Sequence, residues 1–241
     1  MTILEVFILG VLEGLLGFLP MDPEAHAHLA WRWLLGREGP APGVALDLFR
    51  LGTLAAVFVV LRSEILAIVR WKPAWIGWWI LAAAPLAVFG HRTYFMRQML
   101  TLLPWGLLVM GGVLWVVAHR PDVRHVAAEP RKDLSGTDAL LMGLAQVAAL
   151  CPGVSALGLS YASGVICGLE RRAAAAFSLL LLAPALGFRW IEYAIRPGPS
   201  LDLSPVAAAV GGVAAFSTAM MVAGPCLRLF EIEIAESVGV V

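Results

Sequence analysis

Charged residues are scarce in this sequence. Asp, Glu, Lys and Arg make up 14% of its 241 residues, whereas they make up about a quarter of an ordinary soluble domain. Hydrophobic residues make up 60%, and the mean hydropathy is +0.85. This composition excludes a soluble globular domain and indicates a chain that crosses a membrane several times. The formal net charge is zero, so no basic surface is offered to nucleic acid, and we expect no nucleic-acid partner.

Cysteine is rare as well. Cys151, Cys167 and Cys226 lie in apolar runs without the spacing of a metal site. An odd number of cysteines argues against a disulfide framework, so we interpret all three as buried thiols. The N-terminus also lacks a basic region and a small-residue cleavage site, and we therefore expect no removable signal peptide.

Long apolar runs are what the sequence does contain. Five of them are long enough to span a bilayer: 44–61, 74–90, 100–118, 173–190 and 204–224. Two more, 3–36 and 142–168, are interrupted by Pro20 and by Pro152-Gly153, so that no half reaches the about 20 residues of a full crossing. Broken helices persist at membrane depth only inside protein or beside a water-filled cavity. We predict an all-α polytopic membrane protein with about five transmembrane helices and two re-entrant helical hairpins.

The two interrupted segments resemble each other. Each runs from a glycine through an apolar helix to a proline, with Glu13 and Gln146 three residues after Gly10 and Gly143. We predict one membrane domain over 1–241, built from a first inverted repeat (1–118), a connecting loop (119–138) and a shortened second repeat (139–241). Broken segments in corresponding halves locate a binding site near the middle of the membrane. The alternative is that both segments are ordinary kinked spans.

The second break favours an anion. Ser155 and the amides that follow Pro152 lie at a new helix start, where partial positive charge accumulates. We expect Glu13, His26 and Ser155 to surround a shared cavity that the two breaks form.

Four stretches carry a resemblance to a known family: Glu13 to His26, Asp47 to Thr53, Gly143 to Gly158 and Phe177 to Leu181. In this order they resemble the signatures of the undecaprenyl-diphosphatase (bacitracin-resistance) family, whose first signature reads roughly EG-x-TEFLP-[VI]-SSTGH. The resemblance implies a multi-pass protein of the bacterial inner (plasma) membrane that acts on a polyprenyl phosphate lipid. It also implies that Glu13 and His26 act on the phosphate and that Ser155 helps to hold it.

The sequence departs from that pattern at several positions. The second glutamate of the first signature is Gly17, and its Ser-Ser-Thr is Asp22-Pro23-Glu24. The arginine and second serine of the second signature are Ala156 and Leu157. The lost arginine would have supplied a fork of donors for phosphate oxygens.

One positive charge could replace the lost arginine. Arg50 lies inside an apolar span, where an arginine faces an interior partner. We therefore add Arg50, Gly153, Asp22 and Glu24 as candidate ligand-binding residues. The alternative is that Arg50 pairs with Asp47, three residues earlier on the same helical face, or with Glu13.

A metal is a further candidate. Asp22, Glu24, His26 and His28 are residue types that bind a divalent cation, although their spacing spreads them around a helix. The alternative is a hydrogen-bonded polar cluster, and we assign no metal ligand.

Three functions stay open at this point. The first is hydrolysis of undecaprenyl diphosphate. The second is an inactive relative that binds or transports a lipid or small molecule. The third is a structural subunit of a larger membrane complex, which partner membrane subunits would contact through the C-terminal flank that the shortened second repeat leaves uncovered.

Overall fold

The computed structural model describes residues 1–89, 100–119, 131, 133–195 and 203–232. Most of the predicted connecting loop and the last residues of the C-terminal flank lie outside these ranges. The described residues form helices and contain no strand. In chain order the helices are α1 (Ile3–Leu16), α2 (Pro23–Leu29), η1 (Ala30–Leu34), α3 (Gly43–Val60), α4 (Arg62–Trp71), α5 (Ala74–Phe89), η3 (Leu100–Leu102), α7 (Leu103–His119), α8 (Gly136–Ala148), α9 (Ala156–Ile166), α10 (Arg171–Leu180), α11 (Leu182–Ile195) and α12 (Pro205–Ile232).

The predicted all-α polytopic membrane fold is confirmed. Within the described ranges, three helical stretches are long and apolar enough to cross a membrane: Gly43–Val60, Arg171–Ile195 and Pro205–Arg228. A fourth is counted if α4 and the apolar α5 form one bent span. The remaining predicted run, 100–118, corresponds to α7, which is apolar but shorter, with 17 residues.

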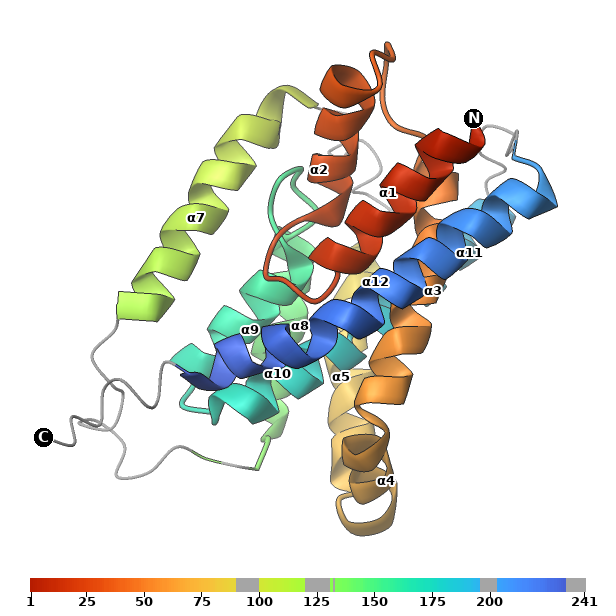
Figure 1. Cartoon of the computed structure of the whole chain (residues 1–241). Coiled ribbons are helices and arrows are strands. Elements are labelled where there is room, and N and C mark those ends of the chain that lie inside the picture. The colour runs from red at the N-terminus through yellow and green to blue at the C-terminus, as the bar shows by residue number, and fades with distance from the viewer. Residues whose placement is uncertain (90–99, 120–130, 132, 196–202, 233–241) are drawn as a thin grey trace, which may run out of the picture.

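Both predicted interruptions are present. The first helix ends at Leu16 and the chain resumes as α2 at Pro23, whereas α8 ends at Ala148 and α9 begins at Ala156. In the first segment the chain reverses, so that α2 returns beside α1 (Figure 1). Prolines at the breaks explain the interruptions, because proline lacks the N–H that a continuing helix requires.

The two broken segments begin in the same way. Thr2 and Glu5 form a capping box at the start of α1, and Ser135 and Asp138 form one at the start of α8. Farther on, Asp22 caps α2 and Ser155 caps α9. Each residue of the first segment has its counterpart at the same distance along the sequence. The counterparts are Thr2 and Ser135, Glu5 and Asp138, Glu13 and Gln146, and Asp22 and Ser155. These equivalences support the predicted inverted repeats, whose boundaries stay a prediction.

The first turn of α8 is held by a buried carboxylate. Burial alone would raise the pKa of Asp138, but hydrogen bonds from Arg131 and Ser135 hold that pKa below its usual value. The ionised side chain therefore serves both as a helix cap and as the partner of Arg131.

The two halves of the chain are interlaced. The N-terminal helix α1 packs most extensively against the C-terminal helix α12, and α8 packs against α5 (Figure 1). Glycines make these contacts close, because a Cβ at Gly14 would collide with the backbone carbonyl of Ala215, and one at Gly143 with that of Ala82. Small residues that let helix backbones approach are the usual means of packing inside membranes, where water does not drive association.

We predict that Gly14→Val lowers the free energy of unfolding by about 1–3 kcal/mol, because the added side chain must push α1 away from α12. The measurement is the midpoint of thermal unfolding in detergent. Gly111→Val is the matched control, since Gly111 lies on α7 with open space around it. Equal midpoints for the two variants would show that close packing of α1 on α12 does not limit stability.

Candidate functional site

The two breaks meet at Asp22. One oxygen of its carboxylate, Oδ1, accepts a hydrogen bond from the backbone N–H of Glu24 at 3.1 Å and so caps α2. The other, Oδ2, accepts from the backbone N–H of Gly153 at 2.9 Å. A single side chain therefore joins the first broken segment to the second, across 131 positions of sequence.

The second break is held tightly in place. Gly153 has a φ of 85°, a left-handed conformation that favours glycine. A Cβ at Gly106 of α7 would collide with the carbonyl of Pro152, and one at Gly158 would lie 3.0 Å from the carbonyl oxygen of Pro20. The turn at 152–153 thus packs directly on α7, and the start of α9 packs on the first break.

Glu13 is buried beside an arginine. Its side chain is 1% exposed, and its two oxygens accept hydrogen bonds from Arg50 Nε at 2.6 Å and Nη2 at 3.4 Å. A carboxylate inside a membrane protein needs such a partner, because an unpaired charge there is costly. Glu13 and Arg50 therefore form an ion pair between α1 and α3.

Asp47 extends this pair into a network. Its fully buried carboxylate accepts from Arg50 Nη1 at 3.0 Å and from Arg189 Nε at 2.6 Å. It also accepts from the Tyr193 hydroxyl at 2.7 Å. Both partners that the sequence suggested for Arg50 are thus present at once.

Arg189 continues the network back to the first break. Its Nη1 donates to Glu24 at 3.2 Å, and its Nη2 lies 3.4 Å from the Tyr193 hydroxyl. The alternating series Glu13–Arg50–Asp47–Arg189–Glu24, which we call the buried ion network, connects α1, α3, α11 and α2. It contains three carboxylates and two guanidinium groups.

Sequence reasoning missed part of this network. The predicted span ended at residue 190, which placed Arg189 at a helix end, whereas α11 continues to Ile195. Arg189 therefore lies within the helix, and Tyr193 follows it by four residues on the same face. The available signal was the same as for Arg50, a cation within a mostly apolar run.

His26 has one ring nitrogen fixed. Its Nδ1 lies 2.7 Å from the backbone carbonyl oxygen of Asp22. A carbonyl oxygen only accepts, so Nδ1 carries a proton, and in the neutral tautomer Nε2 has the lone pair. Neutral His26 is therefore oriented to take a proton, or to attack, through Nε2.

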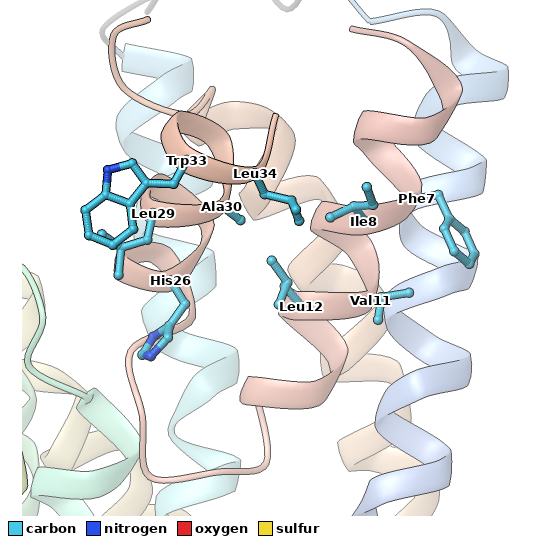
Figure 2. Close-up of a pocket in the computed structure, with 9 residues that line it drawn as sticks. All are labelled: Phe7, Ile8, Val11, Leu12, His26, Leu29, Ala30, Trp33 and Leu34. Carbon is cyan, nitrogen blue, oxygen red and sulfur yellow. The ribbon is translucent and has the colours of Figure 1, made fainter. Parts of the chain in front are cut away.

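An apolar groove begins at His26. The groove has a volume of about 440 Å³ and lies between α1 and the α2–η1 segment (Figure 2). Besides His26, its lining residues are Phe7, Ile8, Val11, Leu12, Leu29, Ala30, Trp33 and Leu34. Of the three residues expected to share a cavity, His26 lines this groove, whereas Glu13 and Ser155 do not.

Ser155 acts as a helix cap. It is 1% exposed, and its Oγ accepts from the backbone N–H of Gly158 at 3.0 Å at the start of α9. The predicted helix start after the break is therefore present, with one of its amides satisfied by the serine itself.

At three of the positions that depart from the family pattern, neighbouring side chains fill the space. A Cβ at Gly17 would collide with the Thr53 side chain, so α3 leaves no room for a glutamate there. Ala156 packs in an apolar cluster with Met110, and Leu157 packs in another with Phe18. The first broken segment instead receives positive charge from Arg50 at Glu13 and from Arg189 at Glu24.

The four candidate metal ligands do not converge. Asp22 binds Gly153, Glu24 binds Arg189, and His28 Nδ1 accepts from Ala41 N at 2.8 Å. Because 23–29 is helical, these side chains point in different directions. In the ranges that the structure covers, no group of three or more His, Cys, Asp and Glu side chains is arranged to hold a metal ion.

Comparison with known proteins gives a consistent result. The sequence model of the family described as "Bacitracin resistance protein BacA" matches residues 6–233 of this chain. The chain is 36% identical over 229 residues to "Undecaprenyl-diphosphatase 2" of Paramagnetospirillum magneticum, covering 91% of this chain and 87% of that protein. It is 34% identical over 212 residues to "Undecaprenyl-diphosphatase 3" of Frankia alni, covering 77% and 71%. "Undecaprenyl-diphosphatase" of Chlorobium luteolum is 33% identical over 208 residues, covering 77% and 73%.

We predict that Arg50→Met destabilises the protein by about 3–5 kcal/mol, because it leaves the carboxylates of Glu13 and Asp47 buried with one partner fewer. The midpoint of thermal unfolding in detergent measures this loss. Adding Glu13→Gln to Arg50→Met should recover part of it, since one uncompensated charge is removed.

The matched control for Arg50 is Arg172→Met. Arg172 also pairs with a glutamate, Glu64, at 3.0 Å, but its side chain is 65% exposed, and loss of such a pair costs about 1 kcal/mol or less. A similar shift for the two arginine variants would contradict the importance of the buried ion network.

Proposed function

We propose that the chain, which belongs to the bacitracin resistance protein BacA family, is a membrane phosphatase that acts on undecaprenyl diphosphate or a related polyprenyl diphosphate. The observation that carries this proposal is the hydrogen bond from Gly153 to Asp22, which brings the two signature segments into contact beside His26. The relatives named as undecaprenyl-diphosphatases support the same substrate class.

The proposed reaction is hydrolysis of the phosphoanhydride bond. Water attacks the terminal phosphorus, the bond to the bridging oxygen breaks, and inorganic phosphate and the lipid monophosphate are the products. His26 Nε2 takes the proton from the attacking water as general base, or attacks the phosphorus itself, because its Nδ1 proton is held by the Asp22 carbonyl.

The remaining candidate residues have supporting roles in this proposal. Glu13 and Arg50 form the buried ion pair that fixes α1 against α3 next to the first break, and the positive charge of the pair lies on Arg50. Asp22 and Glu24 orient the α2 end of the site, while Gly153 and Ser155 shape the second break, where helix-start amides favour an anion.

The apolar groove is suited to the lipid portion of such a substrate. It is lined almost wholly by apolar side chains, and its polar member is His26. His26 lies at one end of the groove (Figure 2). An isoprenoid chain bound in the groove could therefore place its phosphate end near the imidazole. The hydrophobic effect favours burial of the chain by roughly 25 cal/mol per Å² of apolar area.

The proposed location is the bacterial plasma membrane, with several passes. The apolar spans support a membrane location. Neither the comparisons nor the described residues favour the two alternatives, a transporter or a structural subunit. Partner membrane subunits at the C-terminal flank stay a prediction, because residues 233–241 lie outside the described ranges.

We predict that the purified protein releases phosphate from undecaprenyl diphosphate in detergent and that His26→Ala lowers the rate by about 10²–10⁴-fold, the usual contribution of a general base. Phosphate release is measured by colorimetric assay, and the thermal midpoint shows whether the variant is folded. The change removes Nε2 and leaves the Asp22 backbone intact.

His28→Asn provides the control for this experiment. His28 lies on the same helix but accepts a hydrogen bond from Ala41 N, and asparagine retains an acceptor for it. We expect the rate to stay within a few-fold of the wild-type rate. A wild-type protein that is folded but releases no phosphate from any polyprenyl diphosphate would refute the proposed function.

A further inference from the structure

We propose that Arg189 is a phosphate-binding residue of this site, and that it exchanges its contact with Glu24 for an oxygen of the substrate's phosphate. This inference rests on the proposed function and adds to it the residue that recognises the charged end of the lipid. The geometry of the buried ion network supports it in three ways.

First, Arg189 is anchored on one edge and loosely bound on the other. Its Nε donates to Asp47 at 2.6 Å, which is a short charge-assisted bond. Its Nη1 and Nη2 make the longer contacts, 3.2 Å to Glu24 and 3.4 Å to the Tyr193 hydroxyl. The guanidinium is therefore oriented by Asp47 while its outer edge can change partner.

Second, Arg50 is less suited to the same exchange. Its Nε and Nη1 donate to Glu13 and Asp47 at 2.6 and 3.0 Å, and its side chain is 10% exposed. The Arg189 side chain is more open, at 18% exposed. Moving Arg50 would remove the ion-pair partner of Glu13, whose side chain is almost fully buried. Moving Glu24 away from Arg189 costs less, because the Glu24 side chain is 17% exposed.

Third, Glu24 lies next to Asp22, the residue that connects the two breaks. Its backbone N–H binds Asp22 Oδ1, and Asp22 Oδ2 binds the N–H of Gly153. A phosphate that takes the place of the Glu24 carboxylate would therefore bind Arg189 beside the start of α2, which Asp22 ties to the second break. Ala156, where the family pattern has an arginine, follows that break by three residues.

The exchange also solves a problem of charge. The three carboxylates of the buried ion network outnumber its two guanidinium groups, so an approaching phosphate meets an excess of negative charge. Displacing Glu24 removes one repelling carboxylate and frees a planar pair of donors that matches phosphate oxygens. Asp47 and Tyr193 stay behind as the groups that orient the guanidinium.

The test measures dissociation constants for undecaprenyl phosphate in detergent micelles and for inorganic pyrophosphate. Arg189→Met should weaken binding of the lipid phosphate by about 10- to 100-fold, the value of a lost charge-assisted hydrogen bond. Arg189→Lys should restore part of the affinity, because it keeps the charge but not the fork. Glu24→Gln should tighten binding several-fold, since it removes the competing carboxylate.

Comparing the two ligands separates recognition of the phosphoryl group from recognition of the lipid chain. If Arg189 recognises the phosphoryl group itself, Arg189→Met weakens both ligands by similar factors. A loss for undecaprenyl phosphate without a loss for pyrophosphate, in a wild type that binds both, would mean that Arg189 acts on the lipid part and would overturn the inference. The matched control is Arg172→Met with Glu64→Gln, an exposed arginine–glutamate pair whose removal should change neither constant.

Glu24→Gln distinguishes recognition from a structural role. If Arg189 only holds the fold together, both Arg189→Met and Glu24→Gln lower the thermal midpoint, and neither improves binding. Unchanged or weaker binding by a folded Glu24→Gln protein would overturn the inference, even if Arg189→Met fails to fold. Wild-type phosphate release together with unchanged binding by Arg189→Met refutes this inference alone, whereas a wild type that neither binds nor hydrolyses refutes the proposed function.

Discussion

Two arginines within apolar helices have to be neutralised, and that requirement organises the centre of the molecule. Arg50 and Arg189 share the carboxylate of Asp47, and each has a second carboxylate on the first broken segment, Glu13 and Glu24 respectively. Because an uncompensated charge at membrane depth is costly, the series fixes the relative positions of α1, α2, α3 and α11. Asp22 then ties the same segment to the second break.

The departures from the family pattern can be understood together with this network. The side chain of Thr53 fills the space beside Gly17, while apolar side chains pack around Ala156 and Leu157. The positive charge that is absent at Ala156 has counterparts in Arg50 and Arg189, which lie on α3 and α11. The chain thus keeps basic groups near the breaks while their origin in the sequence differs, which is why local motif matching alone underestimates the site.

The sequence was sufficient for features that depend on local chemistry. Pro20 and Pro152 predicted both interruptions, the apolar runs predicted the spans, and a spacing of three residues predicted the contact between Arg50 and Asp47. Arg189 was missed because the apolar run ends before α11 does, so a half-buried arginine inside the helix resembled one at a helix end. The bond between Asp22 and Gly153, like the separation of Ser155 from the groove, depends on how distant helices pack, which no single stretch encodes.

The interlacing of the halves has a consequence for biosynthesis. The glycine face of α1 has its closest partner in α12, which the ribosome produces later than every other helix in the described ranges. During translation α1 therefore enters the membrane long before the surface that covers it exists. The ion pair between Glu13 and Arg50 can form early, whereas the pair between Glu24 and Arg189 forms only after α11 has been made. The buried ion network is consequently completed only after α11 has been synthesised.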